Sequence, residues 1–130
     1  MNQEMANFDW VKARAECSTT EMFNKLRLQV QKDVERWKAL KVNSELKISM
    51  DNEAGVFAVS VEGVAVYRGV RFILAEDAIV VDGIAPEKRM FLASVTLSDD
   101  GECRLKITGK EKEYDLWQFR KLALEWVLFG

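Results

Sequence analysis

The apolar residues of this chain change their spacing twice, and this change constrains the fold more than any other feature. Over residues 8–41 they recur three or four positions apart, as on one face of a helix. From about residue 45 to 107 they alternate with polar residues, as in half-buried strands. Residues 115–129 return to helical spacing with few polar positions. The sequence therefore predicts a single α+β domain over residues 1–130, with an antiparallel sheet between two helical segments.

The N-terminal helical segment contains a start signal inside it. Ser18, followed three residues later by Glu21, fits a capping box, in which the serine accepts from the backbone and the glutamate reaches back. We therefore expect one or two helices here. A break or kink at residues 17–19 would separate a helix at 8–16 from one at 19–41.

About six strands are predicted between the helical segments. Turn-forming stretches at residues 51–55 and 98–101 separate successive strands, and such short connections produce antiparallel pairing. Gly69 is a point at which one strand could bend. The expected strands are residues 45–50, 57–61, 64–74, 79–81, 90–97 and 103–107.

The C-terminal helix is expected to begin at Asp115, which suits an N-cap, and to pack on the sheet. Its apolar surface is wider than an ordinary amphipathic face. A helix of this kind often has two surfaces to cover, one in its own domain and one in a partner. We therefore predict an interface with a protein partner or a second copy at Trp117, Leu124, Leu128 and Phe129.

The four tryptophans all fall in predicted helices. Tryptophan is enriched among the residues that anchor protein interfaces. It also packs in the core between helices and a sheet. The sequence leaves both interpretations open for Trp10, Trp37, Trp117 and Trp126.

The sequence shows no arrangement of residues that is typical of the common catalytic sites. It contains no histidine, which excludes Ser–His and Cys–His nucleophile pairs. The acidic pairs Glu76–Asp77 and Asp99–Asp100 fall at predicted turns, where such residues are common. Zinc and redox metals bind closely spaced Cys and His residues, which are missing here. We expect no catalytic residue, no metal and no cofactor, and hence a protein that is not an enzyme.

The two cysteines and the N-terminal sequence both bear on location. We expect Cys17 and Cys103 to be buried free thiols of a reducing compartment, although a disulfide between them is the alternative. Cys103 alternates with Leu105 and should face inward. Residues 1–4 lack the features of a signal peptide, and no apolar stretch has the length of a membrane span. A cytoplasmic location is therefore expected.

The net charge of −2 is too small to indicate a nucleic-acid or membrane partner, and we expect neither. Residues 51–100 carry only four basic side chains against nine acidic ones. Within them, Arg68 and Arg71 lie close to Tyr67. These three residues form a candidate ligand-binding site, because arginine presents a rigid fork to anions. The alternative is that both arginines pair with acidic side chains of the sheet.

Two functions follow from these features. The first is a non-enzymatic interaction module, a homodimer or a partner-binding protein, that uses the apolar C-terminal helix. The alternative is a carrier of an apolar or amphipathic small molecule, with Arg68 or Arg71 holding a polar head group. The carrier predicts a cavity of roughly 300–1,000 Å³ between sheet and helix. Its lining would include Phe57, Val59, Phe72 and Leu92.

Overall fold

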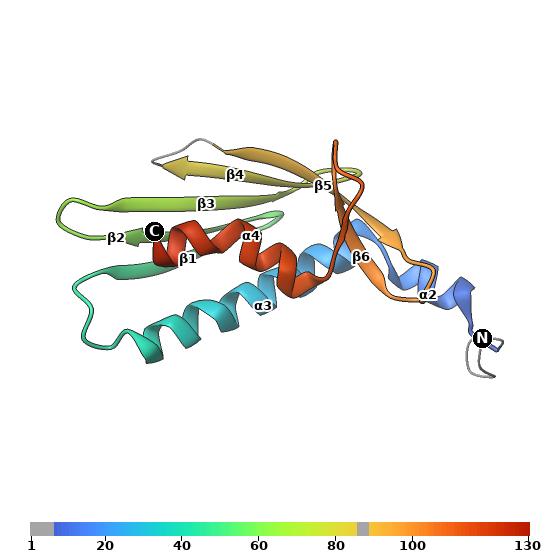
Figure 1. Cartoon of the computed structure of the whole chain (residues 1–130), viewed down its shortest axis with the longest axis horizontal. Coiled ribbons are helices and arrows are strands. Elements are labelled where there is room, and N and C mark those ends of the chain that lie inside the picture. The colour runs from blue at the N-terminus through green and yellow to red at the C-terminus, as the bar shows by residue number, and fades with distance from the viewer. Residues whose placement is uncertain (1–6, 86–88) are drawn as a thin grey trace.

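The computed structural model describes residues 7–85 and 89–130 and confirms the predicted α+β fold. Within these residues, two helices precede a seven-stranded sheet and one helix follows it (Figure 1). The signal-peptide prediction concerns residues 1–4, which lie outside the described residues. The helices are α2 (Trp10–Glu16), α3 (Thr19–Leu40) and α4 (Leu116–Phe129). The strands are β1 (Lys47–Glu53), β2 (Val56–Glu62), β3 (Tyr67–Leu74), β4 (Ile79–Ala85), β5 (Met90–Leu97), β6 (Cys103–Ile107) and β7 (Glu113–Tyr114).

The helices begin where capping residues stand in the sequence. The Ser18 hydroxyl accepts a hydrogen bond from the Glu21 backbone N–H at 3.1 Å, which starts α3 and separates it from α2. At the start of α4, the backbone N–H of Asp115 donates to the side-chain oxygen of Gln118 at 2.9 Å. The predicted break at residues 17–19 and the predicted start of the last helix are both confirmed.

The strands pair in the order in which they occur in the chain, so each connection joins two antiparallel neighbours. The pairing register of β3 with β4 shifts between Gly69 and Val70, which confirms an irregularity at the predicted glycine. The seventh strand was not predicted. It has only two residues, and it pairs Tyr114 with Leu105.

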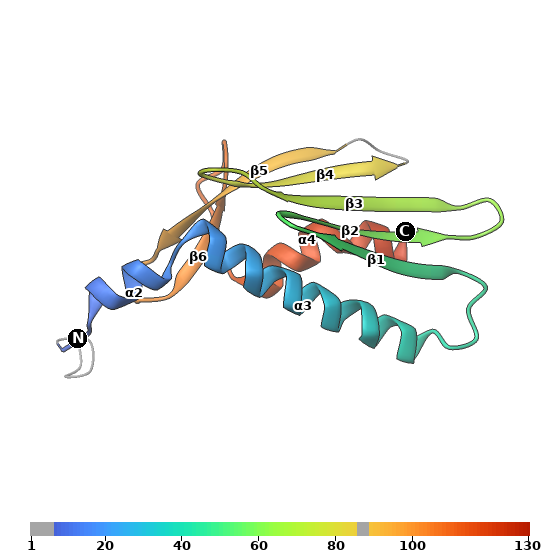
Figure 2. The ribbon, with the colours of Figure 1, turned by 180° about the vertical axis from the view of Figure 1, so that it is seen from behind.

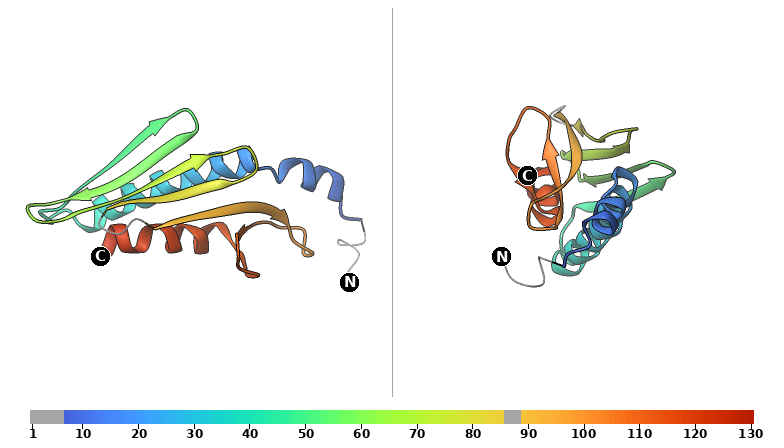
Figure 3. Two further views of the ribbon diagram at one scale, coloured as in Figure 1. Left: turned by 90° about the horizontal axis from the view of Figure 1, so that it is seen from above. Right: turned by 90° about the vertical axis from the view of Figure 1, so that its right-hand side faces the viewer.

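Helices α3 and α4 lie side by side on one face of the sheet, as the end-on and top views show (Figure 3). Helix α3 contacts β1, β3 and β5, whereas α4 contacts β2, β3, β6 and β7. Helix α2 has no buried residue and extends beyond the sheet at the N-terminal end (Figure 2). None of the helices in the described ranges has both the length and the hydropathy of a bilayer span.

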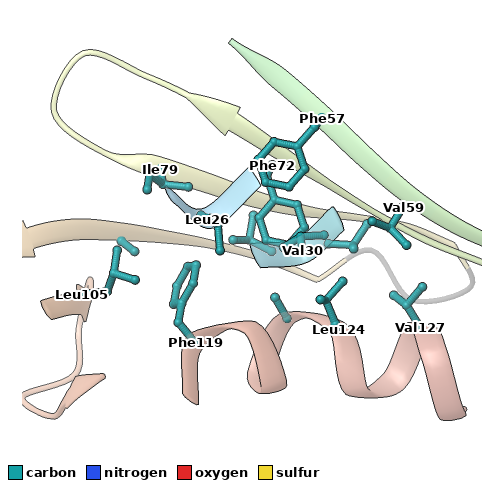
Figure 4. Packing of buried hydrophobic residues seen from close by; sticks show 14 of the residues in the cluster. Leu26, Val30, Phe57, Val59, Phe72, Ile79, Leu105, Phe119, Leu124 and Val127 are labelled. Carbon is teal, nitrogen blue, oxygen red and sulfur yellow. The ribbon is translucent and has the colours of Figure 1, made fainter. Parts of the chain in front are cut away.

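The core fills the space between the sheet and the two long helices (Figure 4). The rings of Phe57 and Phe72 stack with centroids 4.6 Å apart on the sheet side. Leu26 of α3 and Phe119 of α4 pack toward them from the helix side, and all four side chains are fully buried. Full burial of a side chain of this size stabilises the fold by about 1.5–3 kcal/mol.

Cys17 and Cys103 form a disulfide, so the prediction of free thiols was wrong. Cys17 ends α2 at its junction with α3, and Cys103 begins β6. The fold brings this junction over β6, with the two Cα atoms 5.4 Å apart, a separation that a disulfide spans. Cys103 is partly buried against the core, as its alternation with Leu105 predicted.

Candidate functional site

An open groove of about 290 Å³ lies between the C-terminal half of α3 and the whole length of α4. Its lining is mainly apolar. All four residues predicted to form an interface from the sequence line this groove, together with two apolar and two charged residues of α3. The apolar lining residues are Trp37, Leu40, Trp117, Leu124, Leu128 and Phe129.

The four predicted interface residues divide into a floor and a rim. Leu124 and Leu128 are buried, belong to the core, and form the floor. Trp117 and Phe129 keep 57% and 65% of their surfaces exposed and stand at the rim. Leu40 of α3, which is 64% exposed, adds apolar surface on the opposite side. The wide apolar surface of α4 therefore covers the core with one part and leaves the other part open.

Two polar contacts join the helices across the groove. The Arg120 guanidinium donates to the Asp33 carboxylate, with Nε and Oδ2 2.8 Å apart. The indole Nε1 of Trp37 donates to the backbone oxygen of Leu128 at 3.0 Å, and this bond is buried. A buried bond and a partly buried ion pair hold their geometry better than exposed ones, because water competes less for the partners. They set the spacing of the helices and hence the width of the groove.

The charged side chains of the groove leave an excess of positive charge. Three cations and two anions line it. Arg120 pairs with Asp33, and Lys121 pairs with Glu125 at 3.0 Å. The remaining cation, Arg36, has no ion pair within the described part of the chain. An anionic group on a bound partner would therefore be attracted to this side of the groove.

The predicted cluster of Tyr67, Arg68 and Arg71 does not come together. Successive residues of a strand point to opposite faces, so Arg68 lies on the helix side of β3 and the other two lie on the open side. Arg71 forms a 2.6 Å salt bridge with Asp82 of the neighbouring strand. Its pairing with an acidic residue of the sheet was the alternative that the sequence left open.

Arg68 has a different role, which the sequence did not reveal. Its Nε donates to the backbone oxygen of Val127 at 2.9 Å, in the last turn of α4. The last carbonyls of a helix lack partners within the helix and carry partial negative charge. Arg68 thus caps the C-terminal end of α4, and its guanidinium is engaged by a backbone carbonyl of its own chain rather than by a ligand.

The residues expected to line a ligand cavity do not enclose a common cavity. Phe57, Val59 and Phe72 are fully buried in the core. Leu92 is 40% exposed on the opposite face of the sheet. The cavity prediction was wrong for Leu92, because its position in β5 is one residue out of phase with the inward-facing Phe91.

The tryptophans divide between the two interpretations. Trp37 is buried and Trp126 is partly buried against the core. Trp10 and Trp117 are mostly exposed. Of the two exposed residues, Trp117 lines the groove.

Reasoning from the sequence missed the contribution of α3 to the groove. Leu40 lies one turn beyond the last core residue of α3, and Arg36 precedes Trp37, so neither belongs to the buried stripe. The Asp33–Arg120 pair joins residues 87 positions apart. An apolar residue off the core stripe, such as Leu40, was the only local signal.

A second charged cluster stabilises the start of α4. Arg104 of β6 bridges two carboxylates at 2.7 Å, those of Asp100 in the β5–β6 turn and Asp115 at the N-cap. The hydrogen bond from Arg104 lowers the pKa of Asp100, and the two carboxylates raise the pKa of Arg104. All three groups satisfy one another, so this cluster is structural.

No protein-family model, curated protein or solved structure matches this chain. Over residues 7–85 and 89–130, no three side chains of the Cys, Asp and Glu type gather into a group that could hold a metal ion. The candidate functional site is therefore assigned from geometry alone, and it is the α3–α4 groove.

Proposed function

We propose that the protein is a non-enzymatic interaction module whose α3–α4 groove binds an amphipathic helix of a partner protein. The observation that carries this proposal is the convergence of Trp117, Leu124, Leu128 and Phe129 on one open groove. An amphipathic helix commonly places its apolar face in a groove of this kind, with anchors three or four residues apart. Tryptophan is enriched among the anchors of such contacts, and the exposed ring of Trp117 is available to a partner.

The shape of the groove favours a protein segment over a small molecule. Ligand pockets usually have about 300–1,000 Å³ and enclose most of the ligand. The groove has about 290 Å³ and is open along its length. A small apolar ligand would keep much of its surface in water there, whereas a helix would cover the groove and continue beyond it. We therefore place the carrier second.

The charge of the groove indicates that the partner helix is acidic. Arg36 is the lining cation that lacks an ion pair with the described residues. A partner helix with a carboxylate beside its apolar face would supply that ion pair.

We propose a cytoplasmic location for this interaction, as the sequence predicted. The Cys17–Cys103 disulfide does not by itself assign a compartment.

The proposal is tested with displayed amphipathic helices of varied apolar pattern and charge. Peptides selected on the wild-type protein are measured by isothermal titration against Trp117→Glu. We expect the variant to bind at least about 30-fold more weakly, the loss typical of an aromatic residue that anchors an interface. The selected peptides should be acidic, and Arg36→Glu should weaken them as well.

Leu122→Glu is the matched control. Leu122 lies on the same helix and is 41% exposed, but it does not line the groove. The selected peptides should bind this variant and the wild type equally. If the peptides bind Trp117→Glu as tightly as the wild type, or lose affinity equally for both variants, the groove is not the binding site.

A further inference from the structure

We propose that the free edge of β1 pairs with β1 of a second copy of the chain, in an antiparallel, two-fold symmetric dimer with the two Met50 residues opposite each other. This surface is separate from the α3–α4 groove and goes beyond the function proposed for it. The result would be one continuous sheet across two copies, with the helices of both copies on the same face.

The β1–β2 hairpin forms one margin of the sheet, and β1 is the outermost strand (Figure 3). Strand β1 pairs with β2 on one side, and no strand from residues 7–85 or 89–130 pairs with its other side. Most of its seven side chains are exposed. An open edge of this length is a template for another strand.

The backbone groups available on this edge follow from the β1–β2 turn. Glu53 and Val56 pair directly across a two-residue turn. Residues that flank such a turn exchange both backbone hydrogen bonds, and bonded and non-bonded positions then alternate along the strand. The N–H and C=O groups of Ile48, Met50 and Asn52 therefore point outward, away from β2. These three residues offer six backbone groups to a second strand.

The charges of β1 complement themselves, with full overlap of the two strands, when the two-fold axis lies at Met50. A two-fold axis at Met50 places Lys47 of each copy opposite Glu53 of the other, because these residues lie three positions before and after it. Ser49 then faces Asp51, and the seven-residue strands overlap completely. An axis at Asp51 would instead place two carboxylates face to face, which destabilises a strand pair. Charged residues often protect an edge from pairing, but here their opposite signs favour pairing with a copy.

The core side of β1 agrees with the same register. Ile48 and Met50 are only partly buried, and they pack against the edge of the core. With the axis at Met50, the two methionines meet and each isoleucine lies beside them. The partly covered apolar margin of one copy would then be covered by that of the other.

Disulfide trapping tests the register. The Cα atoms of a hydrogen-bonded antiparallel pair are about 5.5 Å apart, within the range that a disulfide spans. Met50→Cys should therefore give a covalent dimer on non-reducing gels under mild oxidation. In Asn52→Cys the two new thiols would lie four positions apart along the strands, roughly 13 Å, and should not be joined. Trapping of both variants alike, or of neither, would overturn the proposal.

Charge reversal tests the complementarity without adding a thiol. Wild-type protein should sediment as a dimer of two 14.9 kDa chains. Glu53→Lys and Lys47→Glu should each weaken the dimer about tenfold or more, since each variant creates two like-charge pairs. The double variant Lys47→Glu/Glu53→Lys restores opposite charges and should recover dimerisation to within about threefold.

Three results would contradict this dimer. They are a monomeric wild type up to its solubility limit, a double variant as weak as the two single variants combined, and a dimer that Trp117→Glu abolishes. The last result would place self-association in the groove instead. Far-UV circular dichroism of each variant verifies that the fold survives. Loss of peptide binding in the groove leaves the β1 dimer unchanged, so the two proposals fail separately.

Discussion

Removal of the Cys17–Cys103 disulfide is expected to lower the free energy of unfolding by several kcal/mol. The two cysteines are separated by 86 positions, so the bond closes a long loop in the unfolded chain. The chain-entropy relation gives about 4.6 kcal/mol for a loop of this length at 25 °C, and losses of native disulfides are typically about 2–5 kcal/mol. For 130 residues, a loss of about 3–4.6 kcal/mol corresponds to a fall in Tm of about 11–17 °C.

The assay is guanidinium unfolding followed by far-UV circular dichroism. It compares oxidised wild type, wild type held in reductant, and the double variant Cys17→Ala/Cys103→Ala. The two forms without the bond should unfold at similar denaturant concentrations, both well below the oxidised protein. The slope against denaturant should rise when the bond is absent, because the unfolded chain exposes more surface. A difference below about 1 kcal/mol between oxidised and reduced wild type would refute the loop-closure reasoning.

The same experiment has a local readout. Helix α2 has no buried residue, and the disulfide at its last turn ties it to β6. Amide exchange in α2 should therefore become nearly unprotected after reduction. The core turns of α3 around Leu26 and Val30 should lose only the protection that corresponds to the fall in the free energy of unfolding, and should remain much better protected than α2. Equal residual protection in both helices would contradict this local role of the bond.

Two further predictions concern polar contacts at the ends of α4. Arg68→Met should lower the free energy of unfolding by about 1.5–3 kcal/mol in denaturant unfolding, because the Val127 carbonyl loses a charge-assisted hydrogen bond. Arg68→Lys should recover only part of the lost stability. An unchanged stability of Arg68→Met would refute the capping role. Arg104 holds the pKa of Asp100 below its ordinary 3.8, so ionised Asp100 stabilises the fold above that pH and the stabilisation is lost as the pH falls through the lower folded value. The difference in Tm between wild type and Asp100→Asn should therefore be present at neutral pH and disappear in strong acid, and a difference independent of pH would contradict the assignment.

The local signals in the sequence were sufficient for most of the fold. Ser18 marked the break before α3 and Asp115 the start of α4, because a cap depends only on residues within one turn. Alternation likewise located six strands. The seventh strand was not predicted because two residues are too few to show an alternation of apolar and polar side chains. The pairing of Tyr114 with Leu105 depends on the tertiary fold.

Contacts between segments far apart in the sequence could not be predicted from local sequence patterns. Arg68 and Arg71 are close in sequence, yet the pleat of β3 sends one to the end of α4 and the other to Asp82. The disulfide depends on how the α2–α3 junction crosses β6, and no spacing of residues encodes that crossing. Local patterns therefore predicted elements well but long-range partners poorly.

The candidate site was predicted in part. The excess apolar width of α4 pointed to Trp117 and Phe129, which the structure leaves exposed at the groove rim. Leu124 and Leu128 belong mainly to the core, because α4 packs against α3 as well as the sheet. The contribution of Leu40 appears only once the two helices are placed side by side.

The most direct test of the groove as an interaction surface is site-specific photocrosslinking in cells of the native host. A photoreactive amino acid replaces Lys121 in one variant and Leu122 in another. Lys121 lines the groove and Leu122 does not, although the two residues are neighbours on the same helix. The proposed function predicts a discrete heavier adduct with one partner from position 121 and none from 122. The absence of an adduct from 121, or the same adducts from both positions, would contradict it.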